Sequence, residues 1–210
     1  MSAKVISSSF VISSPSLELC PPSDKREYVF IGRSNVWKSS LINALCDKQQ
    51  LAKTSGQPGK TQLINYFAVE TAAEDEVVQS RHLVDLPWYW YAKVTRDERA
   101  KWEVMIDDYI LKRTNIAQIY VLIDSRHTPQ KLDTDFVSRL YENQKPFSLV
   151  FTKSDKISQK DLSAHVKMFM DDISVNLEKL PNYYITSAEK KHSTNKLVQS
   201  IHDLNLIINT

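Results

Sequence analysis

One stretch constrains what this chain can fold into more than any other: Gly32-Arg33-Ser34-Asn35-Val36-Trp37-Lys38-Ser39-Ser40. It follows the apolar run 28–31 and precedes the amphipathic run 41–45, so the sequence predicts a strand, a tight loop and a helix. The phosphate-loop pattern G-x-x-x-x-G-K-[ST] is met at Gly32, Lys38 and Ser39. In such a loop, successive backbone N–H groups cradle phosphates at the N-terminus of a helix. The stretch therefore predicts a phosphate-binding loop, with a chance strand–turn–helix as the alternative.

Two side chains of this loop have defined roles in the pattern. Lys38 would reach the β- and γ-phosphates of a nucleotide, and the Ser39 hydroxyl would take one coordination position of Mg²⁺. Trp37, however, stands where the second glycine of the pattern belongs. Glycine lets the backbone approach the phosphates without a Cβ atom, so an indole should clash with the phosphates or distort the loop.

Composition and length limit the class of protein. The 210 residues suffice for one domain with a sizeable core, and a net charge of +2 neither demands nor excludes a nucleic-acid partner. Cys20 and Cys46 have neither metal-binding nor disulfide spacing and are expected to be reduced thiols. The sequence contains no signal-peptide pattern and no apolar run of membrane-spanning length. We therefore expect a cytoplasmic protein that does not associate with a membrane.

The order of expected elements indicates the fold class. Residues 1–26 are rich in Ser and Pro and are expected to form an N-terminal extension with a short edge strand at 10–12. Further strands are expected at 28–31, 61–69, 81–86, 116–123, 147–151 and 183–186, and helices at 39–48, 92–113, 131–143, 159–178 and 193–206. Alternating strands and helices predict an α/β fold over 27–210, with a doubly wound, mostly parallel sheet and one antiparallel edge strand.

A second motif ends the strand expected at 81–86. Asp85 lies at its carboxyl end, where α/β folds bind ligands, and such a carboxylate holds Mg²⁺ through water. Trp88 follows three residues later, where nucleotide switches carry a glycine whose N–H meets the γ-phosphate. The alternative for this motif is an exposed turn with an aromatic anchor.

A third and a fourth motif follow the next strands. Thr152, Lys153 and Asp155 match T-K-x-D, a guanine-reading pattern. Asp155 would accept hydrogen bonds from the guanine N1–H and 2-amino groups, and the Lys153 stem would stack over the base. The fourth motif is a loop whose backbone contacts the guanine oxygen, and a plain helix start is its alternative. Its residues are Thr186, Ser187 and Ala188.

A fifth motif lies between the first helix and the second strand of the domain. Thr61, after Gly59 and Lys60, could complete the Mg²⁺ shell and sense the γ-phosphate. Its alternative is the ordinary preference of threonine for a strand start. The first four motifs occur in the expected order, each after a strand, which makes coincidence a poor explanation.

Together these motifs resemble the EngB (YihA/YsxC) family of bacterial GTPases over nearly the whole chain. The residues that carry the resemblance are Gly32–Val36, Lys38–Asn43, Thr54, Ser55, Pro58–Gln62, Val84–Pro87, Tyr89, Tyr91, Ala92, Asp124–His127 and Thr152–Asp155. The resemblance implies a Ras-like G domain that binds GTP and GDP with Mg²⁺. It also implies a monomer that assists assembly of the large ribosomal subunit and is needed for normal cell division and septation.

The resemblance has two further implications for hydrolysis. Tyr89 follows the position of the third-motif glycine, where many GTPases carry glutamine, so intrinsic hydrolysis is expected to be slow or to need a bound partner. Asn35 stands where some relatives coordinate K⁺, which makes K⁺-stimulated hydrolysis a hypothesis.

Three departures from the family pattern share one form. Trp37, Trp88 and Trp90 all occupy positions that are glycine in the family. The chain also has only three glycines among its 210 residues, whereas glycine usually makes up about 7% of a protein. Some bacteria read the codon UGA as glycine, and a translation that reads UGA as tryptophan would print Trp. The hypothesis is therefore that these three are glycine codons, and UGG at all three positions would contradict it.

Two other functions remain open at this point. One is a G-domain scaffold that no longer binds nucleotide and contacts only ribosomal RNA or protein; the other is a P-loop ATPase or kinase, which the T-K-x-D motif argues against. Basic side chains could face RNA, although a solvated helix face balanced by acidic residues explains them as well. The basic residues are Arg81, Lys93, Arg96, Arg99, Lys101, Lys112 and Arg113, and the acidic ones are Asp97, Glu98, Asp107 and Asp108.

Overall fold

A computed structural model describes residues 3–53, 63–73, 77–88, 96–187 and 192–208. Its strands are β1 (Lys4–Ser14), β2 (Glu27–Gly32), β3 (Ile64–Ala72), β4 (Gln79–Asp85), β5 (Ile116–Asp124), β6 (Phe147–Thr152) and β7 (Tyr183–Ile185). Its helices are α1 (Lys38–Leu45), α2 (Arg96–Lys112), α3 (Lys131–Glu142), α4 (Gln159–Ser174) and α5 (His192–Ile208), with short 3₁₀ turns at Leu17–Leu19 and Ser154–Lys156. In these ranges no helix has the length and apolar character to cross a bilayer.

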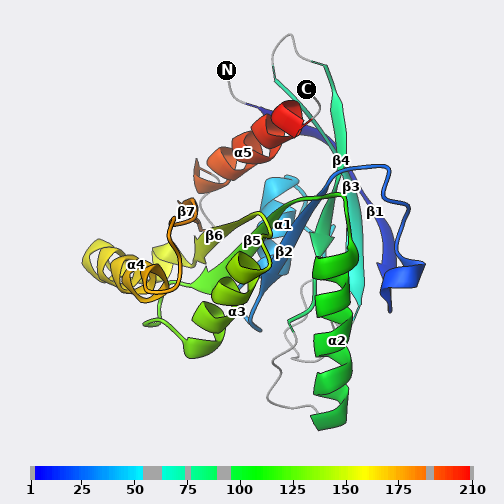
Figure 1. Cartoon of the computed structure of the whole chain (residues 1–210). Coiled ribbons are helices and arrows are strands. Elements are labelled where there is room, and N and C mark those ends of the chain that lie inside the picture. Colours follow the sequence, from blue (N-terminus) through cyan, green and yellow to red (C-terminus); the bar gives the residue numbers. More distant parts are fainter. Residues whose placement is uncertain (1–2, 54–62, 74–76, 89–95, 188–191, 209–210) are drawn as a thin grey trace.

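The strands form one seven-stranded sheet in the order β1-β3-β4-β2-β5-β6-β7. The central pairs are parallel, and β3 runs antiparallel to both of its neighbours. Helices α2, α3 and α4 contribute to one hydrophobic core and α1 and α5 to another, so each face of the sheet is covered (Figure 1). The buried strand β5 has few polar residues because both of its faces meet a core. The predicted doubly wound α/β fold is confirmed.

The N-terminal strand differs from its prediction. The sequence indicated three residues of edge strand, but β1 has 11 residues and pairs with β3 from Lys4↔Ala72 to Ser14↔Ile64. Since β1 lies outside β3, the strand that runs against the others is not the edge of the sheet. Most side chains of β1 are exposed, so backbone pairing more than apolar alternation forms this strand, and the hydrophobic pattern could not reveal its length.

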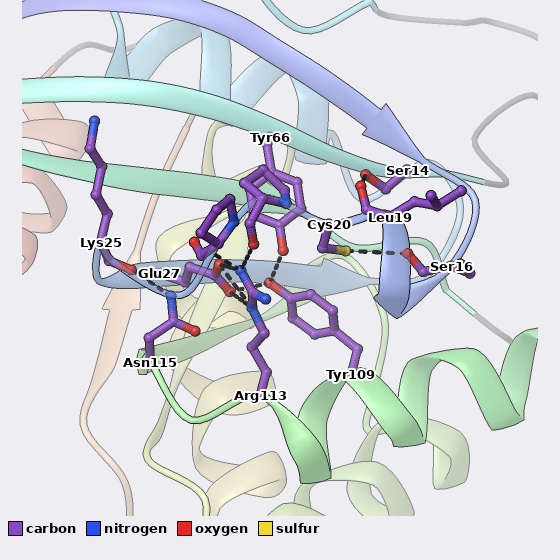
Figure 2. Close-up of polar contacts among 12 residues, drawn as sticks. Ser14, Ser16, Leu19, Cys20, Lys25, Glu27, Tyr66, Tyr109, Arg113 and Asn115 are labelled. Atoms are coloured by element: carbon purple, nitrogen blue, oxygen red, sulfur yellow. Dashed lines mark hydrogen bonds and ion pairs between the residues drawn. The ribbon is translucent and has the colours of Figure 1, made fainter.

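A buried polar cluster joins β2, β3 and α2 (Figure 2). Glu27 is fully buried and accepts hydrogen bonds from the Arg113 guanidinium, at 2.6 and 3.0 Å to one carboxylate oxygen, and from the Tyr109 hydroxyl at 2.5 Å. The Tyr66 hydroxyl donates to that of Tyr109 at 3.0 Å. Arg113 also donates to the carbonyl oxygen of Pro21, which belongs to the connection between β1 and β2. The cluster therefore anchors the C-terminal end of α2 to the sheet and to this connection.

Two residues counted among possible RNA contacts lie inside the protein. Arg81 is fully buried and donates to Thr71 at 2.6 Å and to the Ile201 carbonyl at 2.8 Å. The Arg113 side chain is 9% exposed and pairs with Glu27. For these two the RNA-facing interpretation is wrong, because charge counted along a sequence does not reveal which side chains a fold buries.

Candidate nucleotide-binding site

The carboxyl ends of the parallel strands meet at one edge of the sheet and bring the motif loops together. Gly32 of β2 pairs with β5, Phe30 of β2 pairs with Asp85 of β4, and Asp124 of β5 pairs with Thr152 of β6. This is the edge at which ligands bind in doubly wound sheets. The loop 33–37, the end of β4 and the loop after β6 therefore surround one region.

The loop between β2 and α1 has the backbone geometry of a tight phosphate loop. A Cβ atom on Gly32 would lie 2.7 Å from the Leu122 carbonyl oxygen and 2.9 Å from a methyl carbon of Val36, so only glycine fits there. Asn35 and Trp37 both have left-handed backbones, with φ of 65° and 62°. Trp37 is also the N-cap of α1, and its carbonyl accepts from the Leu41 N–H at 2.8 Å. A left-handed backbone favours glycine, so position 37 has glycine geometry although it carries tryptophan.

Lys38 of the first motif and Asp85 of the second lie in direct contact, which the motifs did not predict. The Lys38 ammonium donates to a carboxylate oxygen of Asp85 and, at 2.7 Å, to the Leu86 carbonyl. Both side chains are largely buried, with 12% and 3% exposed. A lysine that reaches phosphates must leave this carboxylate, so the contact describes a resting arrangement of the two groups.

The Trp37 indole lies beside the T-K-x-D motif. The ring centroid is 5.3 Å from the Lys153 ammonium and 5.6 Å from the Lys156 ammonium, within cation–π distance of both. The sequence indicated only a conflict between this ring and the phosphates. The indole is thus set against the lysine on which a base would stack.

The loop after β6 is held tightly at its base. Lys153 has a left-handed backbone, with φ of 60°. The Ser154 N–H donates to the Thr186 carbonyl at 3.2 Å, and the Thr186 N–H donates to the Phe151 carbonyl at 2.7 Å. These bonds join the third motif to Thr186 and Ser187, the start of the fourth motif.

Asp155 is kept ionised in this loop. Its carboxylate is 5% exposed and lies 3.1 Å from the Lys156 ammonium. Burial favours the neutral acid, but the Ser187 hydroxyl and Lys156 outweigh it and leave the pKa of Asp155 below its usual value. A carboxylate in this state can only accept hydrogen bonds, which is what reading the N–H groups of a guanine edge requires.

Several residues of the predicted motifs lie in parts of the chain that the structure does not describe. Gly59, Lys60, Thr61, Tyr89, Trp90 and Ala188 lie outside the described residues. Trp88 is described: it is 6% exposed and packs edge-on against Phe136 of α3, with ring centroids 5.1 Å apart. The alternative interpretation of this position as an exposed turn is therefore wrong, because α3 covers the indole.

Three acidic or polar residues at this edge had no predicted role: Asp124 and Ser125 were noted only as part of the family resemblance, and Asp133 was not noted at all. Asp124 ends an apolar strand, as Asp85 does, so the same signal could have identified it. Asp133 lies in the first turn of α3, where no pattern distinguished it. With Arg33 and Asn35, Asp124 and Asp133 line a cavity of about 190 Å³ next to the phosphate loop.

Asp133 should make stability depend on pH. One of its oxygens has no hydrogen-bond partner in the described part of the chain, and the other lies 3.6 Å from the Arg33 guanidinium. Burial raises the pKa of Asp133 from 3.8 to about 6, against the effect of Arg33 and with a small addition from Asp124. A raised pKa means that this group stabilises the fold fully below about pH 4, and that the contribution is lost as pH rises through about 6.

Asparagine stays neutral at every pH. We therefore expect the free energy of unfolding of Asp133→Asn, relative to that of the parent, to rise by about 2–3 kcal/mol between pH 4 and pH 7.5. Urea unfolding of the two proteins at several pH values measures this difference. Asp135→Asn on the exposed side of α3 is the matched control and should show no such trend, since Asp135 pairs with Lys131 at the surface. A constant difference between Asp133→Asn and the parent across this pH range would contradict the prediction.

The residues present fit a hard divalent cation. Ser39 in the first turn of α1 supplies a hydroxyl, and Asp85 supplies a buried, charged carboxylate, which is the oxygen chemistry that Mg²⁺ prefers. The described residues contain no group of three His, Cys, Asp or Glu that could hold a metal by themselves.

Comparison with known proteins agrees with this arrangement. The 50S ribosome-binding GTPase family matches residues 27–153. The probable GTP-binding protein EngB of Porphyromonas gingivalis is 44% identical over 196 residues, covering 93% of this chain and 94% of the relative. The protein of the same name from Flavobacterium psychrophilum is 42% identical over 203 residues, covering 96% and 95%.

Solved structures are similar in fold at lower sequence identity. A crystal structure of a probable GTP-binding protein EngB has a TM-score of 0.60 at 19% identity, covering 85% of this chain and 97% of the other. Toc33 from Arabidopsis thaliana, solved with GDP and Mg²⁺, has a TM-score of 0.58 at 15% identity, covering 85% and 83%. At such identities the structures establish the G-domain fold, whereas the relatives at 42–44% identity establish the family. The chain belongs to the EngB family.

Proposed function

We propose that this protein binds GTP and GDP with Mg²⁺ and hydrolyses GTP. The observation that carries the proposal is the meeting of Lys38, Asp85 and Lys153 at one edge of the sheet, each from the motif that the sequence predicted. The family supports GTP hydrolysis in general. The G domain would extend over 27–210, preceded by residues 1–26 as an extension that supplies an edge strand.

The proposed nucleotide contacts follow the five motifs. Backbone N–H groups of the loop and the Lys38 ammonium would bind the phosphates, once Lys38 has left Asp85. Ser39 and Thr61 would hold the Mg²⁺, with Asp85 acting through water, and the ion would neutralise charge that develops on the phosphates. The Lys153 stem would stack on the guanine while Asp155 accepts its N–H groups. The remaining proposed contacts are Gly32, Arg33, Ser34, Asn35, Val36, Trp37, Ser40, Gly59, Lys60, Trp88, Thr152, Thr186, Ser187 and Ala188.

The proposed biological role is assembly of the large ribosomal subunit, with an effect on cell division and septation, by a cytoplasmic monomer that does not bind membranes. It is supported by the match to a family described as 50S ribosome-binding GTPases. Co-sedimentation with purified ribosomal subunits tests it. The protein should pellet with 50S and not 30S particles, more with a non-hydrolysable GTP analogue than with GDP. Equal pelleting with both particles would count against the role.

A second function remains in competition because of one observation. The Trp37 indole lies within cation–π distance of the ammonium groups of Lys153 and Lys156, next to the proposed base site. A chain that truly carries this residue would act as a G-domain scaffold with weak or no nucleotide binding.

A titration with a fluorescent guanine nucleotide in the presence of Mg²⁺ separates the two functions. It compares the chain as written with a variant carrying Trp37→Gly, Trp88→Gly and Trp90→Gly, called here the triple-glycine variant. Binding by the variant that GTP but not ATP reverses supports the proposed function. Binding by neither protein supports the scaffold, and reversal by ATP would favour an ATPase or kinase.

Hydrolysis measured in K⁺ and in Na⁺ tests the role of Asn35, since equal rates would contradict K⁺ stimulation.

A further inference from the structure

Asp124 connects the end of β5 with the base-reading loop. Its carboxylate oxygen Oδ2 lies 2.9 Å from the Lys153 ammonium. The same carboxylate accepts from the Arg126 guanidinium at 2.9 and 2.8 Å, and from the Arg126 backbone N–H at 3.1 Å. Its side chain is 12% exposed. Burial opposes ionisation, yet Arg126 and Lys153 together hold the pKa of Asp124 at about 2. The group is therefore a permanent anion at physiological pH.

The backbone around this contact is fixed on both sides. Asp124 pairs with Thr152 across the sheet. The next residue, Ser125, donates to the Thr152 carbonyl twice, from its hydroxyl at 2.6 Å and from its N–H at 3.1 Å. The Thr152 hydroxyl donates in return to the Ile123 carbonyl at 3.1 Å. The end of β5 and the start of the T-K-x-D loop are therefore held together, and the Lys153 side chain extends from this joined segment.

A lysine stem stacks on a base only if it is held in place. The lysine side chain is a flexible four-carbon chain that ends in a compact point charge. In this protein the charge is tied to Asp124, and the side chain is 4% exposed. The ammonium is then fixed at its far end, and the left-handed backbone of Lys153 fixes the near end.

We propose that Asp124 is a positioning residue for purine binding, which holds the Lys153 ammonium so that the lysine stem is preset to stack on the base. This inference rests on the proposed function. It assigns to Asp124 a contribution to affinity that depends on the presence of a base but not on which purine edge is read. Asp155 has the opposite dependence, since its contacts require the guanine N–H groups.

The test compares three diphosphate ligands. GDP carries the full guanine edge, IDP lacks the 2-amino group, and inorganic pyrophosphate has neither base nor ribose. Affinities are measured by displacement of a fluorescent GDP analogue from full-length protein, both as written and as the triple-glycine variant. In each background Asp124→Asn is compared with the parent. Arg126→Ala is the matched control, because it removes the other cation from Asp124 and leaves Lys153 in contact.

We expect Asp124→Asn to weaken GDP and IDP equally, by about tenfold, as loss of a charge-assisted hydrogen bond predicts. Pyrophosphate binding should change by less than about twofold, and Arg126→Ala should stay within about twofold of the parent for all three ligands. An equal loss for pyrophosphate would show a collapsed site, and unchanged GDP affinity would show that Lys153 needs no anchor. Either result overturns the inference while the proposed function stands. If neither parent binds GDP, both fail together.

Discussion

Replacing Trp37 by glycine is expected to tighten GDP binding by at least about a hundredfold, which corresponds to about 2.7 kcal/mol. Two physical causes add in the same direction. A non-glycine residue with a left-handed backbone costs about 1–2 kcal/mol, so the free protein populates the loop geometry that closes around the phosphates less with tryptophan than with glycine. The indole also lies against Lys153 and Lys156 and would have to leave them before a base could stack. Titration with a fluorescent GDP analogue in Mg²⁺ measures the gain.

Trp37→Ala separates the two causes. Alanine removes the indole but keeps a Cβ atom and the disfavoured backbone, so its affinity should lie between those of tryptophan and glycine. Trp102→Phe on α2 is the control for a general effect of losing an indole, since Trp102 packs against the hydrophobic core. If Trp37→Gly bound GDP no better than the parent, the loop would tolerate the indole and the steric argument would be wrong.

The backbone at position 37 bears on the origin of the three tryptophans. Position 37 has a φ of 62°, which glycine adopts freely and tryptophan rarely does. Trp88, by contrast, is packed against Phe136 like a core residue. Glycine codons therefore explain the geometry at position 37 directly, whereas at position 88 the fold can also accommodate the indole. Reading the genomic codons at 37, 88 and 90 tests the hypothesis, and UGG at each would refute it.

The sequence predicts a site residue when its chemical role fixes both the residue type and its spacing from other residues. Lys38, Asp85 and Lys153 were predicted because phosphate and guanine recognition fix residue types at fixed spacings after strands. Asp124 has no such spacing of its own, and its contact with Lys153 arises from the pairing of β5 with β6. Asp133 comes to the same edge only through the packing of α3. The position of such a residue can be predicted from its strand, but its role through a neighbour in space becomes clear only once the sheet order is known.

The fold was predictable to the same extent. Apolar periodicity located the buried strands and the helices to within a few residues. It missed most of β1, whose serines and exposed apolar residues do not alternate. Counting charges along the sequence also suggested that Arg81 and Arg113 face solvent or RNA, although hydrogen-bond partners distant in sequence allow both to be buried. Long-range polar contacts decide such cases, and no local pattern encodes them.

The largest loss of stability is expected from Glu27→Ala. Glu27 is fully buried, and its removal leaves the Arg113 guanidinium and the Tyr109 hydroxyl without the acceptor that both use (Figure 2). Breaking a buried ion pair from one side costs about 3–5 kcal/mol, a large part of the roughly 5–15 kcal/mol that stabilises a typical domain. Urea unfolding followed by circular dichroism should show a midpoint shifted far below that of the parent.

Asp108→Ala breaks the exposed pair with Lys112, at 2.8 Å, and should cost less than about 1 kcal/mol. The double variant Glu27→Leu, Arg113→Met should recover much of the loss, because it removes both charges together. A Glu27→Ala protein within about 1 kcal/mol of the parent would contradict this account, and would mean that the buried cluster does not hold α2 to the sheet.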